Sequence, residues 1–268
     1  MARIASRQAA ESKNMSDRIV SLSTKHEQLP LKEPFETAKR RALTSGTVFV
    51  ELKTENGIIG LGAATPVQYV TGETVESIIA DIKAASERII GDNIITFTNI
   101  ITKLNTLLHE SPGARAAIEF AILDAYGKIY KKPVYEIFDG KEMVFETDVT
   151  IPVVTPEHAA ELAIQASELG FRKFNINVGS EHDEDLARVL SISRSVPGSN
   201  LILDANQGFQ PDEAVKFIHK LVNEVKIDVF EQPVDKSDVE GLAYVNKNTN
   251  VPVYADESVL DIDDLIKL

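Results

Sequence analysis

The chain has 268 residues, of which 43% are hydrophobic and 26% are charged, so it is long enough for one large globular domain or two smaller ones. Its 41 acidic and 28 basic residues give a formal net charge of −13, which opposes binding to nucleic acid or to an anionic membrane surface. No apolar run approaches the ~20 residues of a membrane helix, and no signal-peptide core is present at the N-terminus. The absence of cysteine excludes disulfide and thiol chemistry and favours a cytoplasmic protein.

The N-terminal half predicts an α+β domain over residues 15–141. Residues 1–14 are polar without a strong period, and we interpret them as a tag-like or disordered extension outside the fold. Asn56-Gly57 lies between two alternating segments, which is a strong hairpin signal. The expected strands are 18–29, 48–54 and 58–63, and the expected helices are 73–90, 97–110 and 114–130.

A basic cluster, Lys39, Arg40 and Arg41, follows two prolines in a chain that is otherwise acidic. Charge runs are usually exposed, so one interpretation is a solvated loop over residues 30–41. The other is a flap whose cations meet an anionic substrate.

After Lys141 the pattern changes to short strands that alternate with helices. This alternation predicts a parallel sheet flanked by helices. The glycine signature of a dinucleotide-binding fold is missing after the first strand, and polar residues end nearly every strand, so a β/α barrel is favoured over a doubly wound sheet. Only five strand–helix units can be counted over residues 142–268, whereas a closed barrel has eight, so we expect an incomplete barrel. The expected strands are 144–151, 172–178, 200–205, 228–233 and 251–256.

Three of these strands end in a carboxylate: Asp204, Glu231 and Asp256. A single acid at such a place often caps the next helix. Three acids at the ends of neighbouring parallel strands converge at one rim, where they form a site for a hard cation. Ligation by oxygen alone, with no cysteine in the chain, favours Mg²⁺ over zinc.

The motifs DAN, EQP and ADES at successive strand ends, after an α+β domain that contains PFETA and GLGAATPVQYVTGET, carry a resemblance. In this combination the chain resembles the enolase superfamily, muconate-lactonising subgroup, and within it the dipeptide epimerases that act on L-Ala-D/L-Glu. The resemblance implies a capping domain before the barrel and an isomerase that removes an α-proton through an enediolate. It also implies a small dipeptide as the substrate, with Lys39, Arg40 and Arg41 as candidates to bind its acidic side chain. By resemblance Asp204, Glu231 and Asp256 are the Mg²⁺ ligands, and Asn206 and Gln232 support them.

The second barrel strand departs from the family pattern. The subgroup carries Lys-x-Lys there as its bases, and this chain has Asn175 and Asn177 at the two positions. An amide cannot accept a proton near neutral pH, and Lys173 lies roughly 13 Å deeper along the strand than Asn177. We therefore expect epimerisation to be impaired or absent. The two asparagines are interpreted either as polar lining left after loss of the bases or as a retained ligand-binding pair.

Other functions remain open at this point. The chain could be a non-catalytic metal-binding, ligand-binding or scaffold protein, or another superfamily enzyme such as a cycloisomerase or an acid-sugar dehydratase. A five-stranded sheet that stops at Leu268 exposes two edges, so we expect a C-terminally truncated barrel that forms homo-oligomers, which light scattering would test.

Overall fold

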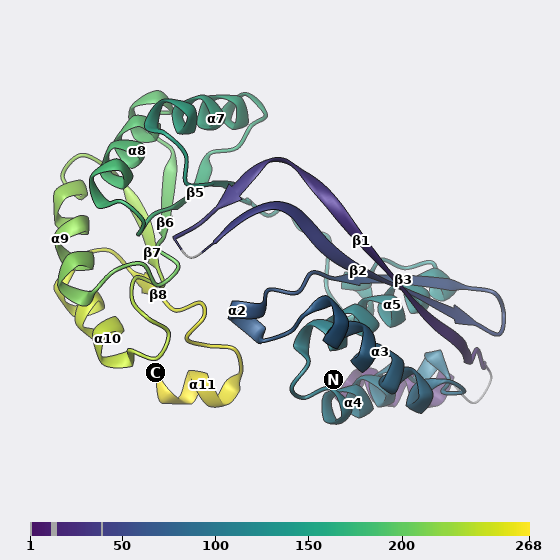
Figure 1. The fold of residues 1–268 in the computed structure, drawn as a ribbon. Coiled ribbons are helices and arrows are strands. Elements are labelled where there is room, and N and C mark those ends of the chain that lie inside the picture. The colour runs from purple at the N-terminus through teal and green to yellow at the C-terminus, as the bar shows by residue number, and fades with distance from the viewer. Residues whose placement is uncertain (1, 12–14, 39) are drawn as a thin grey trace. The chain divides into compact units, whose positions relative to one another are not determined.

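The computed structural model describes residues 2–11, 15–38 and 40–268 (Figure 1). The chain divides into two compact units. The N-terminal unit contains Met1–Pro30 and Thr44–Met143, and the C-terminal unit contains Leu31–Leu43 and Val144–Leu268. The chain passes between the two units near residues 30, 43 and 143, so the short segment 31–43 belongs to the second unit.

The N-terminal unit has a three-stranded sheet in the order β1-β2-β3. The last two strands pair in antiparallel register around the predicted Asn-Gly turn, where Gly57 has a φ of 81°. Residues 30–41, for which a solvated loop was one of two interpretations, are mostly strand: β1 continues through both prolines to Glu36. The loop interpretation was wrong because β1 is an edge strand, where a proline removes no inner ladder bond. The strands are β1 (Ile19–Glu36), β2 (Arg41–Thr54) and β3 (Ile59–Ala64).

Helices pack against this sheet around a core rich in isoleucine, leucine and alanine. Two glycines of β3 allow its backbone to lie directly on α5: a Cβ at Gly62 would come within 1.9 Å of the Ala117 carbonyl oxygen. Helix α3 begins with a capping box between Thr74 and Ser77. The helices are α1 (Ala2–Glu11), α2 (Gln68–Thr71), α3 (Val75–Ile89), the 3₁₀ turn η1 (Ile94–Thr96), α4 (Phe97–Leu107), α5 (Pro112–Tyr130) and α6 (Val134–Ile137).

Helix α1 occupies most of the segment predicted as a tag-like or disordered extension. Ile4 is buried, and Gln8 accepts hydrogen bonds from the backbone N–H and the hydroxyl of Thr98, at 3.3 and 2.7 Å. These two side chains lie four residues apart and so share one face of the helix. A single apolar residue and an amide gave too weak a pattern for the contact to be predicted.

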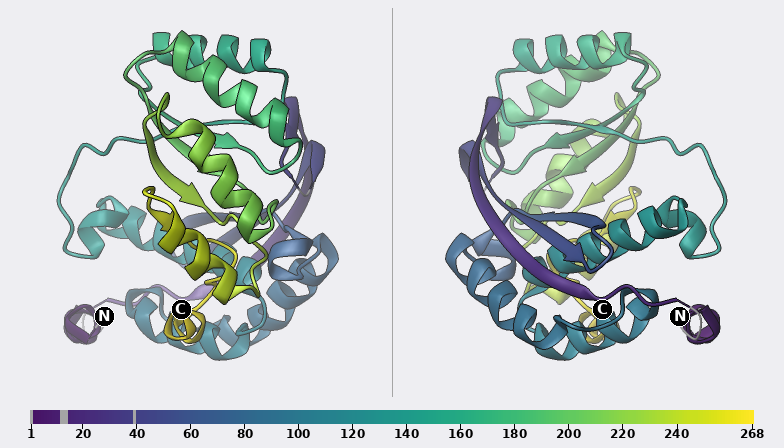
Figure 2. Two further views of the ribbon diagram at one scale, coloured as in Figure 1. Left: turned by 90° about the vertical axis from the view of Figure 1, so that its left-hand side faces the viewer. Right: turned by 90° about the vertical axis from the view of Figure 1, so that its right-hand side faces the viewer.

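The C-terminal unit has one parallel sheet in the order β4-β5-β6-β7-β8. Helices alternate with the strands and cover one face of the sheet (Figure 1). The left-hand view of Figure 2 looks onto these green and yellow-green helices, with the strands behind them. This arrangement confirms the predicted β/α class with about five units of a barrel. The elements are β4 (Val149–Ile151), α7 (Pro156–Glu168), β5 (Lys173–Asn177), α8 (His182–Ser195), β6 (Asn200–Asp204), α9 (Pro211–Leu221), β7 (Ile227–Glu231), α10 (Val239–Asn248), β8 (Val253–Tyr254) and α11 (Ile262–Lys267).

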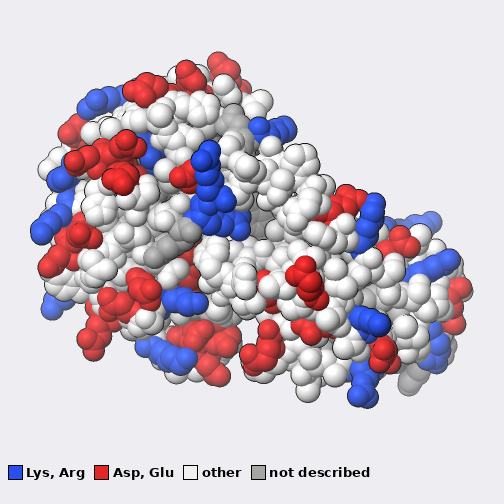
Figure 3. Space-filling view, viewed as in Figure 1, with Lys and Arg blue, Asp and Glu red and all other residues white. Residues whose placement is uncertain are grey.

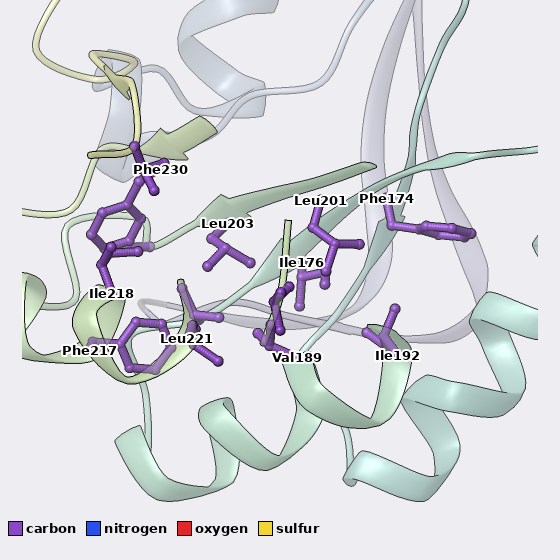
Figure 4. Packing of buried hydrophobic residues seen from close by; sticks show 14 of the residues in the cluster. Phe174, Ile176, Val189, Ile192, Leu201, Leu203, Phe217, Ile218, Leu221 and Phe230 are labelled. Carbon is purple, nitrogen blue, oxygen red and sulfur yellow. The ribbon is translucent and has the colours of Figure 1, made fainter. Parts of the chain in front are cut away.

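Successive side chains along each strand point to opposite faces of the sheet. Ile176, Leu203 and Phe230 are fully buried and pack into the helix-covered core (Figure 4). The residues next to them in each strand point to the other face of the sheet, which α7 to α10 do not cover. That face carries the amides and carboxylates at the strand ends.

The segment 31–43 contacts the edge of this sheet. The Glu36 carbonyl oxygen accepts a hydrogen bond from the Val153 N–H at 3.0 Å, just after β4. Phe35 and Ile151 line a cleft of about 220 Å³ between this segment and β4. The tip of the long hairpin therefore partly covers an edge that was expected to be open.

The charge of the described surface is mixed. On the face shown in Figure 3, acidic and basic side chains alternate without a continuous basic area among the residues drawn. No helix in the described part of the chain is long and apolar enough to cross a membrane.

Candidate metal and ligand site

The candidate residues of β5, β6 and β7 lie at the carboxyl end of the parallel sheet. Asn177, Asp204 and Glu231 are aligned in register on β5, β6 and β7, so their side chains emerge side by side on one face. Asn175 lies two residues earlier on the same face, opposite Ile202 of β6. The structure thus places Asn177 next to Asp204, with Asn175 two residues earlier along the same strand.

Asp204 is held by Asn206, the last residue of the DAN motif. The Asn206 side-chain amide donates to both carboxylate oxygens of Asp204, at 2.7 and 2.8 Å, and its backbone N–H donates at 3.0 Å. This turn requires a φ of 42° at Asn206, a left-handed conformation that asparagine tolerates better than most residues. Asn206 therefore fixes the orientation of the Asp204 carboxylate.

Gln232 joins the end of β7 to the segment that carries Asp256. Its side chain is completely buried, and its Oε1 accepts from the backbone N–H groups of Asp256 and Ser258, at 2.8 and 3.1 Å. Its Nε2 donates to the Ser258 hydroxyl at 2.7 Å and to the Val234 carbonyl at 3.0 Å. The third carboxylate is thus placed by an amide from the neighbouring strand end.

The carboxylates at this rim are partly removed from water and repel one another. Burial raises the pKa of Asp204 to about 6, against the hydrogen bonds from Asn206, which lower it. Burial, together with repulsion from Asp204 and Asp256, raises the pKa of Glu231 to about 7. The pKa of Glu257 is also raised, chiefly by burial. Clustered, desolvated carboxylates of this kind are stabilised by a cation.

The residues fit a divalent metal by type and by their unused hydrogen-bonding atoms. The Asn206 Oδ1 and Glu257 Oε2 atoms are buried without a hydrogen-bond partner in the described structure. The described residues contain no three acidic or histidine side chains already close enough to hold an ion, so ligation by Asp204, Glu231 and Asp256 requires side-chain movements. All the candidate donors are oxygens, which suits Mg²⁺.

A buried ion pair supports the end of β5. Arg188 and Asp185 of α8 are both fully buried and lie 2.6 Å apart. Arg188 also donates to the carbonyl oxygens of Val154 and Asn177, at 2.7 and 3.0 Å. Asp185 accepts from the N–H groups that follow β5, those of Gly179 at 2.7 Å and Ser180 at 3.0 Å. Sequence analysis missed this pair because an Asp and an Arg three residues apart on a helix usually form an exposed pair.

The predicted basic residues of the hairpin are engaged locally. The Arg40 guanidinium lies 5.9 Å from the centre of the Phe35 ring, and the Arg41 Nε lies 3.4 Å from the Glu36 carboxylate. Lys39 lies outside the described residues. The role of Lys39, Arg40 and Arg41 in binding a substrate stays a prediction.

The pH dependence of stability provides a test of the carboxylate cluster. Asp204 and Glu231 bind protons more tightly in the folded chain than in the unfolded chain, whose pKa values are near 3.8 and 4.5. The folded state therefore loses stability as the pH rises from about 4 to about 7, and the loss is complete above that range. After allowance for partial exposure, we expect the free energy of unfolding in EDTA to fall by about 2–3 kcal/mol between pH 4.5 and pH 8.

Denaturant titration at several pH values would measure this change. Asp204→Asn removes one charge and its repulsion on Glu231, so it should flatten the profile and raise the stability at pH 8. The matched control is Glu240→Gln, at an exposed position of α10. If the free energy of unfolding of Asp204→Asn fell with pH as steeply as that of Glu240→Gln, the assignment of Asp204 to a mutually repelling carboxylate cluster would be contradicted.

Comparison with known proteins places these features in a family. Residues 19–138 match the mandelate racemase/muconate lactonizing enzyme N-terminal domain, and residues 157–268 match the enolase C-terminal domain-like model. An L-Ala-D/L-Glu epimerase of Clostridium acetobutylicum is 37% identical over 91% of this chain and 69% of its own length. The chain belongs to the enolase superfamily. Its predicted resemblance to the dipeptide epimerases is confirmed.

Solved structures agree with the family assignment. The dipeptide epimerase of Enterococcus faecalis, complexed with Mg and the dipeptide L-Leu-L-Tyr, matches with a TM-score of 0.88 and 33% identity over 94% of this chain and 71% of that one. A substrate-liganded L-Ala-D/L-Glu epimerase of Bacillus subtilis also has a TM-score of 0.88 and 33% identity, over 93% and 71% of the two chains. The enolase-superfamily fold therefore extends over nearly all of this chain.

Proposed function

We propose that this chain is a Mg²⁺-dependent, dipeptide-binding member of the dipeptide epimerase group in which α-proton transfer is impaired. The observation that carries the proposal is the alignment of Asp204 and Glu231 at adjacent strand ends, with pKa values of about 6 and about 7. Relatives crystallised with Mg and a dipeptide support the choice of ligands. Asp256 is the proposed third ligand.

The cation would supply positive charge to neutralise a substrate carboxylate and the enediolate formed from it. The three acids would hold it, while Asn206 orients Asp204 and Gln232 orients the segment of Asp256. Such supporting amides keep the ligand oxygens in place before a ligand arrives.

Proton transfer is where the chain departs from its family pattern. At the two positions where the pattern has lysine bases, the side chains are the amides of Asn175 and Asn177, which cannot accept a proton near neutral pH. Lys173 shares their face but belongs to the opposite end of β5, where it lines a separate cavity with Arg172 and Asn200. Binding without efficient turnover is the consequence. The arginines of the hairpin remain candidates to meet an acidic substrate side chain.

The test has two parts in one sample. Calorimetric titration with Mg²⁺ should show binding that Asp204→Asn and Glu231→Gln each weaken at least tenfold, while Glu240→Gln leaves it unchanged. With Mg²⁺ present, ¹H NMR of L-Ala-L-Glu in D₂O should show α-proton exchange at least ~10²-fold to 10⁴-fold slower than with an active relative, because a general base contributes about that factor.

The outcomes separate the parts of the proposal. Exchange at the rate of an active relative would refute the impairment. No Mg²⁺ binding, or binding that ignores both acidic substitutions, would refute the site and favour a structural role.

A further inference from the structure

Two buried side-chain amide atoms on β5 have no hydrogen-bond partner in the described structure. The Nδ2 of Asn177 is a donor and the Oδ1 of Asn175 is an acceptor, and each is buried without a hydrogen-bond partner. The Asn177 residue is only 2% exposed. Both side chains project from the same face of β5, with α-carbons about 6.6 Å apart at about 3.3 Å per residue.

Buried amides without a partner lower the stability of the folded chain if they only line the sheet. A buried polar atom without a partner costs about 1–3 kcal/mol, and apolar residues at the same positions would avoid that cost. The neighbouring strands leave both atoms unbonded: Asn175 lies opposite Ile202 of β6 and Thr150 of β4, and Asn177 lies opposite Asp204, whose oxygens accept from Asn206.

The backbone that carries the amides is fixed. The carbonyl oxygen of Asn177 accepts from the buried Arg188, and the N–H of Val178 donates to the Asp204 carbonyl at 2.8 Å. The strand end therefore cannot rotate to hide the amides. It holds one donor and one acceptor beside the first proposed metal ligand.

We infer that Asn175 and Asn177 bind the peptide group of a dipeptide whose carboxylate is held by the cation. The inference rests on the proposed function and adds the part of the ligand that β5 recognises. A peptide group presents a C=O acceptor and an N–H donor on opposite sides, and hydrogen bonds of about 2.9 Å to each would satisfy both amides.

The asparagine pair differs in kind from the lysine pair of the family pattern. A lysine ammonium has three donors and no acceptor, so it cannot receive the ligand N–H. An amide offers both functions and carries no charge. With asparagine in place of the two lysine bases, β5 would no longer transfer a proton. It would instead bind ligands with a peptide group in preference to esters and free acids.

The test compares two ligands on protein saturated with Mg²⁺. One is L-Ala-L-Glu, and the other is its ester analogue, in which the peptide N–H is replaced by oxygen. Calorimetry should show the ester binding at least tenfold more weakly than the dipeptide. The loss arises because the Asn175 oxygen would face an oxygen instead of an N–H group.

Substitutions locate the effect. Asn175→Asp keeps the acceptor and should keep the preference for the dipeptide, whereas Asn175→Ala should reduce the preference to less than threefold. Asn177→Asp removes the donor to the C=O group and should weaken both ligands together. Asn223→Ala, at an exposed site just after α9, is the control and should behave like the unmodified chain.

The results distinguish two failures. If the protein binds Mg²⁺ but binds the dipeptide and the ester equally well, or does not bind the dipeptide, the inference is overturned and the metal site is unaffected. Loss of Mg²⁺ binding in the unmodified chain would overturn the proposed function itself.

Discussion

Replacement of Arg188 with alanine should lower the free energy of unfolding by about 3–5 kcal/mol, because it leaves the buried Asp185 carboxylate without its charge partner. The change also removes hydrogen bonds to the carbonyl oxygens of Val154, in the loop after β4, and of Asn177, the last residue of β5. The effect is local to the carboxyl end of the sheet, because β5 carries Asn175 and Asn177 and pairs with the strand of Asp204.

Denaturant unfolding of the metal-free chain would measure the loss. Removal of both charges, in Asp185→Leu/Arg188→Met, should cost less than Arg188→Ala alone, since no unpaired charge stays buried. Arg194→Ala on the same helix breaks an exposed ion pair with Glu224 and should change stability by less than about 1 kcal/mol. Equal effects of Arg188→Ala and Arg194→Ala would contradict the role assigned to the buried pair.

Gly62→Ala should be at least as damaging, at more than about 3 kcal/mol, and it acts in the N-terminal unit. The added Cβ would lie 1.9 Å from the carbonyl oxygen of Ala117 and 3.0 Å from the Ala121 nitrogen, so β3 and α5 must separate. These are backbone atoms of a long helix in a close-packed core and cannot move aside as a side chain does.

The matched control is Gly46→Ala in β2. Its Cβ would meet the Gln28 side-chain nitrogen at 3.1 Å, an atom at the end of a flexible side chain. We expect a change within about 1 kcal/mol. Thermal or denaturant unfolding of both variants should therefore give clearly different midpoints. Similar midpoints would show that the strand and helix have more freedom than their packing indicates.

The sequence predicted the site best where the candidate residues directly follow strands that the hydrophobic pattern also predicts. Each acid of the DAN and EQP motifs follows an apolar strand, and parallel strands must bring their carboxyl ends together, so the neighbouring placement of Asp204 and Glu231 was predictable. In the structure Asn177, at the end of the preceding strand, lies opposite Asp204. Alternation in the strands then separated the core residues from those that face the site.

The contacts that fix these residues could not be predicted. The bonds of Gln232 to the backbone of Asp256 and Ser258 depend on the path of two loops, and nothing in the motif EQP indicates a partner 24 or more residues away. The buried state of Arg188 depends on how α8 lies against the ends of β4 and β5. Strand β1 was underestimated because proline lowers strand propensity in general, while its position at the sheet edge makes proline acceptable.

The boundary between the two units does not correspond to one position in the sequence. The chain crosses this boundary near residues 30, 43 and 143, because the tip of the β1–β2 hairpin belongs to the same compact unit as the parallel sheet. A polypeptide cut after Met143 would therefore separate Val153 from Glu36, the residue whose carbonyl it contacts beside β4. The hairpin tip, Leu31–Leu43, is thirteen residues long and belongs to the same unit as the parallel sheet. A substitution within this tip therefore acts on the sheet that carries the proposed site.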